Sequence, residues 1–305
     1  MDYKRILKSQ SLRRKILRML SFIPDKPMIK LQYRLKMGRK LDLKNPRRFT
    51  EKLQWYKLYY KNPLMIQCVD KYDVREYVKS KGLEDILIPC YGVFDSADDI
   101  DWDSLPNQFV MKDTLGGGGN SVIIIKDKTK EDISELKRRA TEWTRIKAHV
   151  KSDGREWPYY SGKNHRIIIE QFINSGSSKV GLIDYKFFCF GGSTKFIYVM
   201  GDRRVGEKVR VRLLDRDFNW LPVTRVGDED LGELEEPENY KKMLKVAEKL
   251  AEEFLHVRVD LYNIDGKIRF GELTFYNASG YMMYKPDEFD IVVGDYFQIS
   301  NHDKP

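Results

Sequence analysis

Two acidic residues and one arginine near the C-terminal end of the chain could bind a metal–phosphate group. Arg258 and Asp260 are two residues apart in an expected strand at 257–262, so their side chains share one face of a sheet. Glu272 lies near the end of the expected partner strand at 268–273, which brings it roughly opposite Asp260. Two carboxylates on one sheet face repel each other unless a cation or an arginine lies between them.

Magnesium suits such a hairpin, because Mg²⁺ prefers carboxylate and phosphate oxygens. The hairpin could therefore hold Mg²⁺ between the protein and a nucleotide. The alternative is a surface hairpin whose charges are solvated. Leu261, Phe270 and Leu273 make the two strands largely apolar. A largely apolar hairpin is not expected to be fully exposed, which favours the metal site.

Four consecutive glycines, Gly116, Gly117, Gly118 and Gly119, follow a strand that ends near Lys112. Glycine lets a backbone approach phosphate oxygens closely and direct several N–H groups at them. A P-loop is excluded because no Lys-Ser/Thr pair follows, and a Rossmann turn because a β-branched strand follows instead of a helix. The segment is either a flap that closes over a triphosphate, with Lys112 neutralising charge, or a glycine-rich hairpin without a ligand.

The elements expected to position these residues alternate irregularly between helices and strands. Helices are predicted at 50–60 with Thr50 as the N-cap, from Pro63 to Lys79, at 133–150 and at 240–255. Strands are predicted at 86–94, 109–112, 121–125, 166–173, on both sides of Gly191-Gly192 within 179–199, at 209–214, and on both sides of a turn at 263–266. This mixture predicts an α+β protein with mainly antiparallel strand pairs.

Composition bounds the function only loosely. The 305 residues carry a net charge of +9, which suggests an anionic partner such as a nucleotide or an acidic glycan. The three cysteines are far apart and are expected to be single buried thiols. No apolar run reaches the roughly 18–20 residues of a membrane span, and no signal peptide is evident, so we expect a cytoplasmic protein.

The first 25 residues are basic and partly amphipathic. A helix with this pattern could lie on an anionic membrane surface at the inner face of the membrane. Alternatively, it packs on the body of the protein with its charges solvated, an interpretation that the shortness of the apolar stripe favours.

Lys112 before the glycine loop, together with the R-x-D…E hairpin, resembles the ATP-grasp superfamily. The segment 258–280 is similar to the R-V-D…L-E-x-N-…-G segment of D-alanine–D-alanine ligases. Gly38-Arg-Lys-Leu41, the segment 45–55 and Asp70-Lys-Tyr72 resemble the TupA-like branch, which is named for teichuronopeptide biosynthesis. The resemblance spans nearly the whole chain.

The resemblance implies an ATP-grasp fold, with two α+β subdomains that hold ATP between mainly antiparallel sheets. It divides the chain into a helical N-terminal region at 1–82, a small subdomain with the glycine loop at 83–166, and a large subdomain with the metal site at 167–305.

The resemblance also implies a role for each matching residue. Lys112 would contact the α- and β-phosphates and assist catalysis, the loop Gly116, Gly117, Gly118 and Gly119 would cover the triphosphate, and Lys71 would lie near the nucleotide. The adenine linker would comprise Glu170, Gln171, Phe172 and Ile173.

On the hairpin, Asp260 and Glu272 would bind Mg²⁺, and Arg258 would steady the acyl phosphate and the oxyanion that follows it. Thr274 stands where the superfamily usually has Asn, so either Asn277 substitutes as a ligand or one metal site is weakened.

The expected activity is an ADP-forming carboxylate–amine ligase of cell-surface polysaccharide synthesis. It would join an acidic sugar or peptide to an amine or amino acid. Asp202-Arg203-Arg204, Arg210 and Arg212 could hold the acidic substrate or form an ordinary solvated basic face.

Two other functions compete with the ligase. The first is an ATP-grasp kinase that phosphorylates a glycan hydroxyl. The second is a non-enzymatic module that binds anions or nucleic acid, but no RNP-like aromatic pattern or zinc finger supports it, so we expect no nucleic-acid partner.

Overall fold

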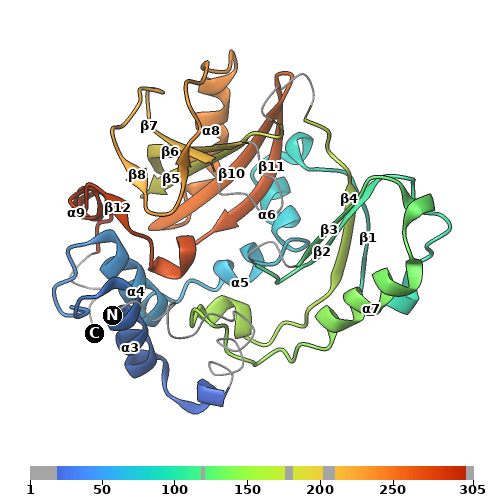
Figure 1. Ribbon diagram of the computed structural model, residues 1–305, viewed down its shortest axis with the longest axis horizontal. Helices are drawn as coiled ribbons and strands as arrows, with labels where there is room; N and C mark the ends of the chain where they lie inside the picture. Colours follow the sequence, from blue (N-terminus) through green and yellow to red (C-terminus); the bar gives the residue numbers. More distant parts are fainter. Residues whose placement is uncertain (1–18, 118–120, 176–180, 202–209, 300–305) are drawn as a thin grey trace. The chain divides into compact units, whose positions relative to one another are not determined.

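The computed structural model describes residues 19–117, 121–175, 181–201 and 210–299, and it has the α+β architecture that the sequence predicts. Contacts divide the chain into two compact units, whose elements are labelled in Figure 1. Unit 1 comprises residues 1–62, 151–157 and 177–305, and unit 2 comprises residues 63–150 and 158–176. The regions predicted from the sequence, 1–82, 83–166 and 167–305, have other boundaries than these units. One reason is that α4 (Phe49–Tyr59) packs against α9 (Phe289–Tyr296), which places residues from both ends of the chain in unit 1.

Unit 2 contains a four-stranded antiparallel sheet with the strand order β1-β4-β2-β3. Its strands are β1 (Cys90–Phe94), β2 (Phe109–Asp113), β3 (Val122–Ile125) and β4 (Ile167–Gln171). Its α-helices are α5 (Leu64–Cys68), α6 (Val74–Ser80) and α7 (Ile133–Thr144), and short 3-10 helices lie at Glu84–Ile86, Ala97–Asp99 and Lys128–Lys130. The predicted strand–glycine–strand arrangement at 109–125 is confirmed.

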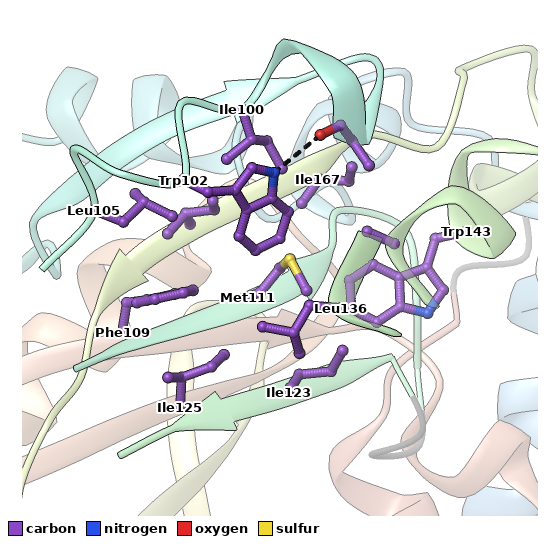
Figure 2. Close-up of a cluster of buried hydrophobic side chains, with 13 residues drawn as sticks. Ile100, Trp102, Leu105, Phe109, Met111, Ile123, Ile125, Leu136, Trp143 and Ile167 are labelled. Carbon is purple, nitrogen blue, oxygen red and sulfur yellow. Dashed lines mark hydrogen bonds between the residues drawn. The ribbon is translucent and has the colours of Figure 1, made fainter. Parts of the chain in front are cut away.

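One face of this sheet is covered by an apolar core that Figure 2 shows. Met111 of β2 and Ile123 of β3 point into it and pack with Leu136 and Trp143 of α7. Because strand side chains alternate between faces, Lys112 points to the opposite face of the sheet. The sequence therefore separates the core face from a polar face on the same strand.

Unit 1 contains a six-stranded sheet with the order β11-β10-β5-β6-β7-β9, in which only the short β7–β9 pair is parallel. Its strands are β5 (Asp184–Phe190), β6 (Ser193–Gly201), β7 (Arg210–Asp215), β9 (Glu229–Asp230), β10 (His256–Ile264) and β11 (Lys267–Thr274), and β8 (Thr224–Arg225) pairs with β12 (Tyr284–Lys285). The helices are α3 (Asp25–Met37), α4, α8 (Tyr240–Ala251) and α9, with 3-10 turns at η1 (Leu20–Phe22) and η6 (Asn277–Gly280). Within this unit α8 packs against β10, β5 and β6. A further 3-10 turn, Trp157–Tyr160, starts at the last residue of a unit 1 segment and continues into unit 2.

Several predicted boundaries are wrong, each for a local reason. Thr50 is not the N-cap of α4: the helix starts at Phe49, and the Thr50 hydroxyl donates to Asp290 Oδ2 at 2.7 Å. The single helix predicted from Pro63 to Lys79 is two helices, because Asp70 Oδ1 accepts from the backbone N–H groups of Tyr72 and Asp73 and forms a turn between them.

Other segments are shorter than predicted. The helix predicted at 133–150 ends at Thr144, the helix at 240–255 ends at Ala251, and the strand predicted from 86 begins at Cys90 after a 3-10 turn. The hairpin turn is not the four residues 263–266 but Asp265-Gly266 alone, because Ile264 pairs with Lys267. Both turn residues have positive φ, 48° and 78°, as a type I′ turn requires.

His256 lies at the start of β10 inside an aromatic cluster of unit 1. Its ring lies 4.5 Å from that of Phe190 and 5.1 Å from that of Phe49. Its Nδ1 bonds to the Cys189 carbonyl at 2.9 Å, whereas its buried Nε2 has no partner among the described residues. Burial lowers the pKa of His256 to about 3.

We therefore predict acid sensitivity that depends on His256. An unfolded histidine takes up its proton near pH 6.5, whereas the folded pKa is about 3. Between these values the unfolded chain binds more protons, so stability is lost as pH falls, by up to about 1.4 kcal/mol per pH unit. The free energy of unfolding of wild type and of His256→Phe is measured by chemical denaturation at a series of pH values from neutral to acid. If the two proteins lose stability in parallel as pH falls, the prediction is contradicted.

Candidate active site

The acidic hairpin of unit 1 has the register that brings its carboxylates together. Asp260 pairs directly with Glu272, whereas Leu261 pairs with Phe270, so Gly271 is the extra residue of a β-bulge. Without the bulge, the two-residue turn would pair Asp260 with Gly271 and send Glu272 to the other face of the sheet. Space is also tight there, because a Cβ at Gly271 would lie 3.0 Å from the carbonyl oxygen of Asp260.

Arg258 lies between the two carboxylates, as their repulsion requires. Its Nε donates to Asp260 Oδ1 at 2.6 Å, and its Nη2 donates to Asp260 Oδ2 at 2.7 Å and to Glu272 Oε1 at 3.0 Å. Arg258 and Asp260 are buried, with 8% and 2% exposure, whereas the Glu272 side chain is 47% exposed. The predicted shared face of Arg258 and Asp260 is confirmed, and only Glu272 is open to solvent.

Lys186 of β5 belongs to the same cluster, and sequence reasoning missed it. It pairs with Asp260 across the β5–β10 ladder, and its Nζ bonds to Asp260 Oδ2 and to Asp184 Oδ2, the latter at 2.5 Å. The signal was present: Asp184 and Lys186 are polar residues two apart at the start of an otherwise apolar, aromatic strand.

The charges of this cluster control its protonation. Burial raises the pKa of Asp260, and the charges of Arg258 and Lys186 oppose that rise. Burial lowers the pKa of Arg258, but the negative charges of Asp260 and Glu272 more than offset it and leave this pKa raised. Arg258 therefore stays a cation at any physiological pH.

Asp260 and Glu272 are the predicted Mg²⁺ ligands; both oxygens of Asp260 accept hydrogen bonds from Arg258, whereas the Glu272 side chain is 47% exposed. Mg²⁺ is usually bound by one or two carboxylates, with substrate phosphates and waters completing its shell. The residues that the structure describes contain no group of three or more His, Cys, Asp or Glu side chains suited to a metal. The protein alone thus offers a partial ligand set, of which Glu272 is the exposed member.

Helix α4 holds the segment that follows the hairpin. Gln54 Nε2 donates to the carbonyl oxygen of Gly280 at 2.8 Å, and Lys57 Nζ donates to those of Ser279 at 2.7 Å and Gly154 at 2.8 Å. Ser279 has a φ of 53°, an uncommon backbone state for a residue with a side chain. These bonds fix the backbone beside Asn277, whose Oδ1 accepts from Arg258.

Lys57 is fully buried and donates to a third acceptor, Gln54 Oε1, at 3.0 Å. Three acceptors require three N–H groups, which only the ammonium form has. Burial lowers the pKa of Lys57 to about 7, so this form is complete only at mildly acidic pH.

Unit 2 carries the predicted phosphate-contacting lysine. Lys112 Nζ donates to Glu170 Oε2 at 2.6 Å, across the β2–β4 pair and on the face opposite the core. Arg75 of α6 lies 3.5 Å from the other oxygen of Glu170 and was not predicted. Glu170 and Gln171 end β4, and Phe172 and Ile173 follow it. Lys112 and Glu170, which are distant in sequence, thus meet at one place in the fold.

The start of the glycine loop is tied to the Asp70-Lys71-Tyr72 segment. The Lys71 backbone N–H donates to the Thr114 carbonyl at 2.9 Å, and Lys71 Nζ donates to the carbonyl of Gly116. A Cβ at Gly116 would collide with Ser121 and Asp113, so glycine is required there. Gly117 is described, whereas Gly118 and Gly119 lie outside the described residues.

The predicted substrate arginines have local partners. Arg212 Nη1 lies 3.2 Å from Asp230 Oδ2, and Arg210 Nη2 donates to the Leu231 carbonyl at 3.4 Å. Asp202, Arg203 and Arg204 lie outside the described residues.

Antiparallel sheets in both units, a strand–glycine–strand segment and an R-x-D…E hairpin define an α+β protein of the ATP-grasp class. The model of the family described as TupA-like ATPgrasp matches residues 51–298. The chain therefore belongs to the TupA-like ATP-grasp family. A comparison with curated proteins gave no match.

Solved structures with a similar fold are distant in sequence. D-alanine–D-alanine ligase from Bacillus anthracis is 17% identical, with a TM-score of 0.46 over 75% of this chain and 67% of that one. L-amino acid ligase from Bacillus licheniformis is 16% identical, with a TM-score of 0.44 over 71% and 42%. An N5-carboxyaminoimidazole ribonucleotide synthetase in its ADP complex is 16% identical, with a TM-score of 0.43 over 74% and 50%. The chain thus spans from under half to two thirds of the length of these structures.

The α4 clamp leads to a prediction. Lys57→Met leaves the carbonyl of Gly154 without this donor, and we expect it to destabilise the protein by about 1–3 kcal/mol. Lys52→Met is the matched control on the same helix, because Lys52 donates to the carbonyls of Gly294 and Phe297 at 2.7 and 2.8 Å.

Hydrogen exchange at mildly acidic pH separates the two variants. The Ser279 and Tyr281 amides, which bond to the carbonyls of Tyr276 and Ala278, should exchange faster in Lys57→Met but not in Lys52→Met. Equal exchange of these amides in both variants would show that Lys57 does not hold the segment.

Proposed function

We propose that the protein is an ADP-forming ligase that activates a carboxylate with ATP and joins it to an amine. ATP-grasp enzymes bind ATP or ADP, and the family assignment supports ATP as the co-substrate. The observation that carries the proposal is the buried Arg258–Asp260 pair with Glu272 exposed beside it. It combines a permanent cation with an accessible carboxylate for Mg²⁺.

The proposed nucleotide contacts belong to unit 2, and the proposed metal ligands belong to unit 1. Lys112 would neutralise the α- and β-phosphates, Lys71 and the loop beginning at Gly116 would contact the triphosphate, and the segment 170–173 would contact adenine. Lys112 is held by Glu170, so phosphate would compete with this carboxylate for the ammonium group. Asp260 and Glu272 would hold Mg²⁺, which supplies charge neutralisation for phosphoryl transfer when bound.

The reaction would proceed in two balanced steps. A carboxylate oxygen attacks the γ-phosphorus, and the bond between this phosphorus and the β-phosphate oxygen breaks. The products of this step are an acyl phosphate and ADP. An amine nitrogen then attacks the acyl carbon, the C–O bond to phosphate breaks, and an amide, a proton and free phosphate result. Arg258 would stabilise negative charge on the acyl phosphate and on the tetrahedral oxyanion.

The family assignment also supports a proposal for the substrate class. We propose an acidic sugar or peptide of cell-surface polysaccharide synthesis as the acceptor, with an amine or amino acid as the nucleophile. The net charge of +9 supports an anionic acceptor.

An isotope experiment tests the reaction type. The chain is screened for ADP release with uronic acids and amino acids, and the active acceptor is then labelled with oxygen-18 in its carboxylate. A ligase transfers one labelled oxygen to free phosphate, which mass spectrometry detects. Phosphate retained on the acceptor would instead identify a kinase acting on a hydroxyl group, and no ATP-dependent turnover with any acceptor would contradict both enzymes.

The metal assignment makes a separate prediction. Glu272→Gln removes the exposed anionic ligand and should raise the Mg²⁺ concentration for half-maximal ADP release by at least about tenfold, the lower bound seen even for outer-shell groups. Glu229→Gln on β9, also an exposed carboxylate of unit 1, should behave like wild type. An unchanged Mg²⁺ dependence in Glu272→Gln would remove Glu272 from the metal site.

A further inference from the structure

A strongly basic surface lies on α3 and the turn after it. Residues 26–40 contain six cationic and no acidic side chains, a charge of +6 against +9 for the whole chain. The acidic residue Asp25 precedes them and pairs with Arg155 and Lys151, each at 3.0 Å. Arg39 is also paired, with Asp287 at 2.8 Å. Lys30, Arg34 and Lys40 are exposed cations of this segment.

Large apolar side chains are exposed among these cations. Leu31 and Leu35, one helical turn apart and next to Lys30 and Arg34, are 48% and 47% exposed. Phe22, just before α3, is 79% exposed, the highest value for a large apolar residue in the described part of the chain. An exposed helix side with both apolar and basic residues, as Leu31, Leu35, Lys30 and Arg34 form here, is typical of an interaction surface.

The opposite side of α3 explains why these residues cannot turn inward. Met28, Ile29 and Tyr33 are buried in unit 1, and the Tyr33 hydroxyl bonds to Thr50 Oγ1 at 2.9 Å. This anchoring fixes the rotation of the helix, so Leu31 and Leu35 stay at the surface with Lys30 and Arg34.

A hollow lined by cations of this segment adds a place for an anionic group. It has a volume of about 290 Å³ and is lined by Lys30, Arg34, Lys40 and Leu41. Three cations around one hollow are complementary in charge to the phosphate headgroup of a lipid. The exposed leucines are complementary to the apolar acyl chains of the same lipid.

We propose that this side of α3 docks on an anionic lipid bilayer, with Phe22, Leu31 and Leu35 entering the headgroup region and Lys30, Arg34 and Lys40 contacting lipid phosphates. In a dimer through this surface, the +6 charge of residues 26–40 would face the same charge on the second copy. A nucleic acid would neutralise the cations but leave the leucines exposed to water. An anionic bilayer contacts both kinds of side chain and therefore fits better than either. No helix among the described residues is long and apolar enough to cross a membrane, so the contact is peripheral. This proposal does not depend on the ligase reaction.

Vesicle cosedimentation of the full chain tests the proposal. We expect binding to vesicles with about 30 mol% phosphatidylglycerol in phosphatidylcholine, weak binding to phosphatidylcholine alone, and release at about 0.5 M salt, where the Debye length is short. Lys30→Glu with Arg34→Glu should lower partitioning at least about 25-fold, since each of the two cations removed contributes about fivefold near an anionic surface. Leu31→Ser with Leu35→Ser should lower it at least about tenfold.

Two matched control variants use exposed pairs one turn apart on other helices of unit 1. Lys241→Glu with Lys245→Glu on α8 controls for charge, and Val292→Ser with Tyr296→Ser on α9 controls for apolar exposure. The charge variants should keep the wild-type melting temperature, because all four substituted cations are exposed. The apolar variants are compared below their melting temperatures, because the Tyr296 ring also lies 6.1 Å from that of Phe190. Both control pairs should bind vesicles like wild type.

Several outcomes would overturn the proposal. One is equal binding to both vesicle types, and another is equal loss in the control variants. A dimer in light scattering that the leucine substitutions dissociate would assign the surface to a second copy. Tighter binding to DNA or RNA than to vesicles at the same salt, lost in the charge variant, would assign it to nucleic acid.

Discussion

The buried ion pair between Arg258 and Asp260 is the constraint on which unit 1 depends. Both side chains are almost fully removed from solvent, and a buried charge is costly unless it is paired and hydrogen-bonded. Removing one member of such a pair typically costs about 3–5 kcal/mol, because the other is left uncompensated. Lys186, Glu272 and Asn277 satisfy the remaining donors and acceptors, so each of their elements must stay in register.

That register comes from the backbone rather than from the charged side chains. The Asp265-Gly266 turn sets the hairpin, and the bulge at Gly271 then shifts β11 by one residue, so that Glu272 faces Asp260. After the hairpin, Ala278 and Ser279 have φ values of 47° and 53°, which the backbone adopts at a cost. The hydrogen bonds from Gln54 and Lys57 offset this cost, which makes an N-terminal helix part of a C-terminal site.

Features set by local pattern could be predicted from the sequence, and features set by distant pairing could not. The periodicity of α8 and the strand–glycine–strand segment depend on neighbouring residues and were predicted correctly in kind. The polar Asp184 and Lys186 stand out in an apolar strand, but that Lys186 contacts Asp260 depends on the pairing of β5 with β10 across 74 residues, which local sequence does not specify. Thr50 looks like an N-cap because it precedes an apolar run, but its hydroxyl bonds to Asp290, 240 residues away.

The position of Thr274 bears on how many metal ions the hairpin can hold. The Thr274 hydroxyl donates to Glu272 Oε1 and accepts from Arg258 Nη2, both at 3.0 Å, so it orients the carboxylate. Asn277, the predicted substitute ligand, has an Oδ1 that accepts from Arg258 and an Nδ2 that donates to Met282 Sδ at 3.0 Å, and both oxygens of Asp260 accept from Arg258 in the same way. A metal ion at this hairpin would therefore share Asp260 and Asn277 with Arg258, and Glu272, whose side chain is 47% exposed, is the predicted ligand most open to it.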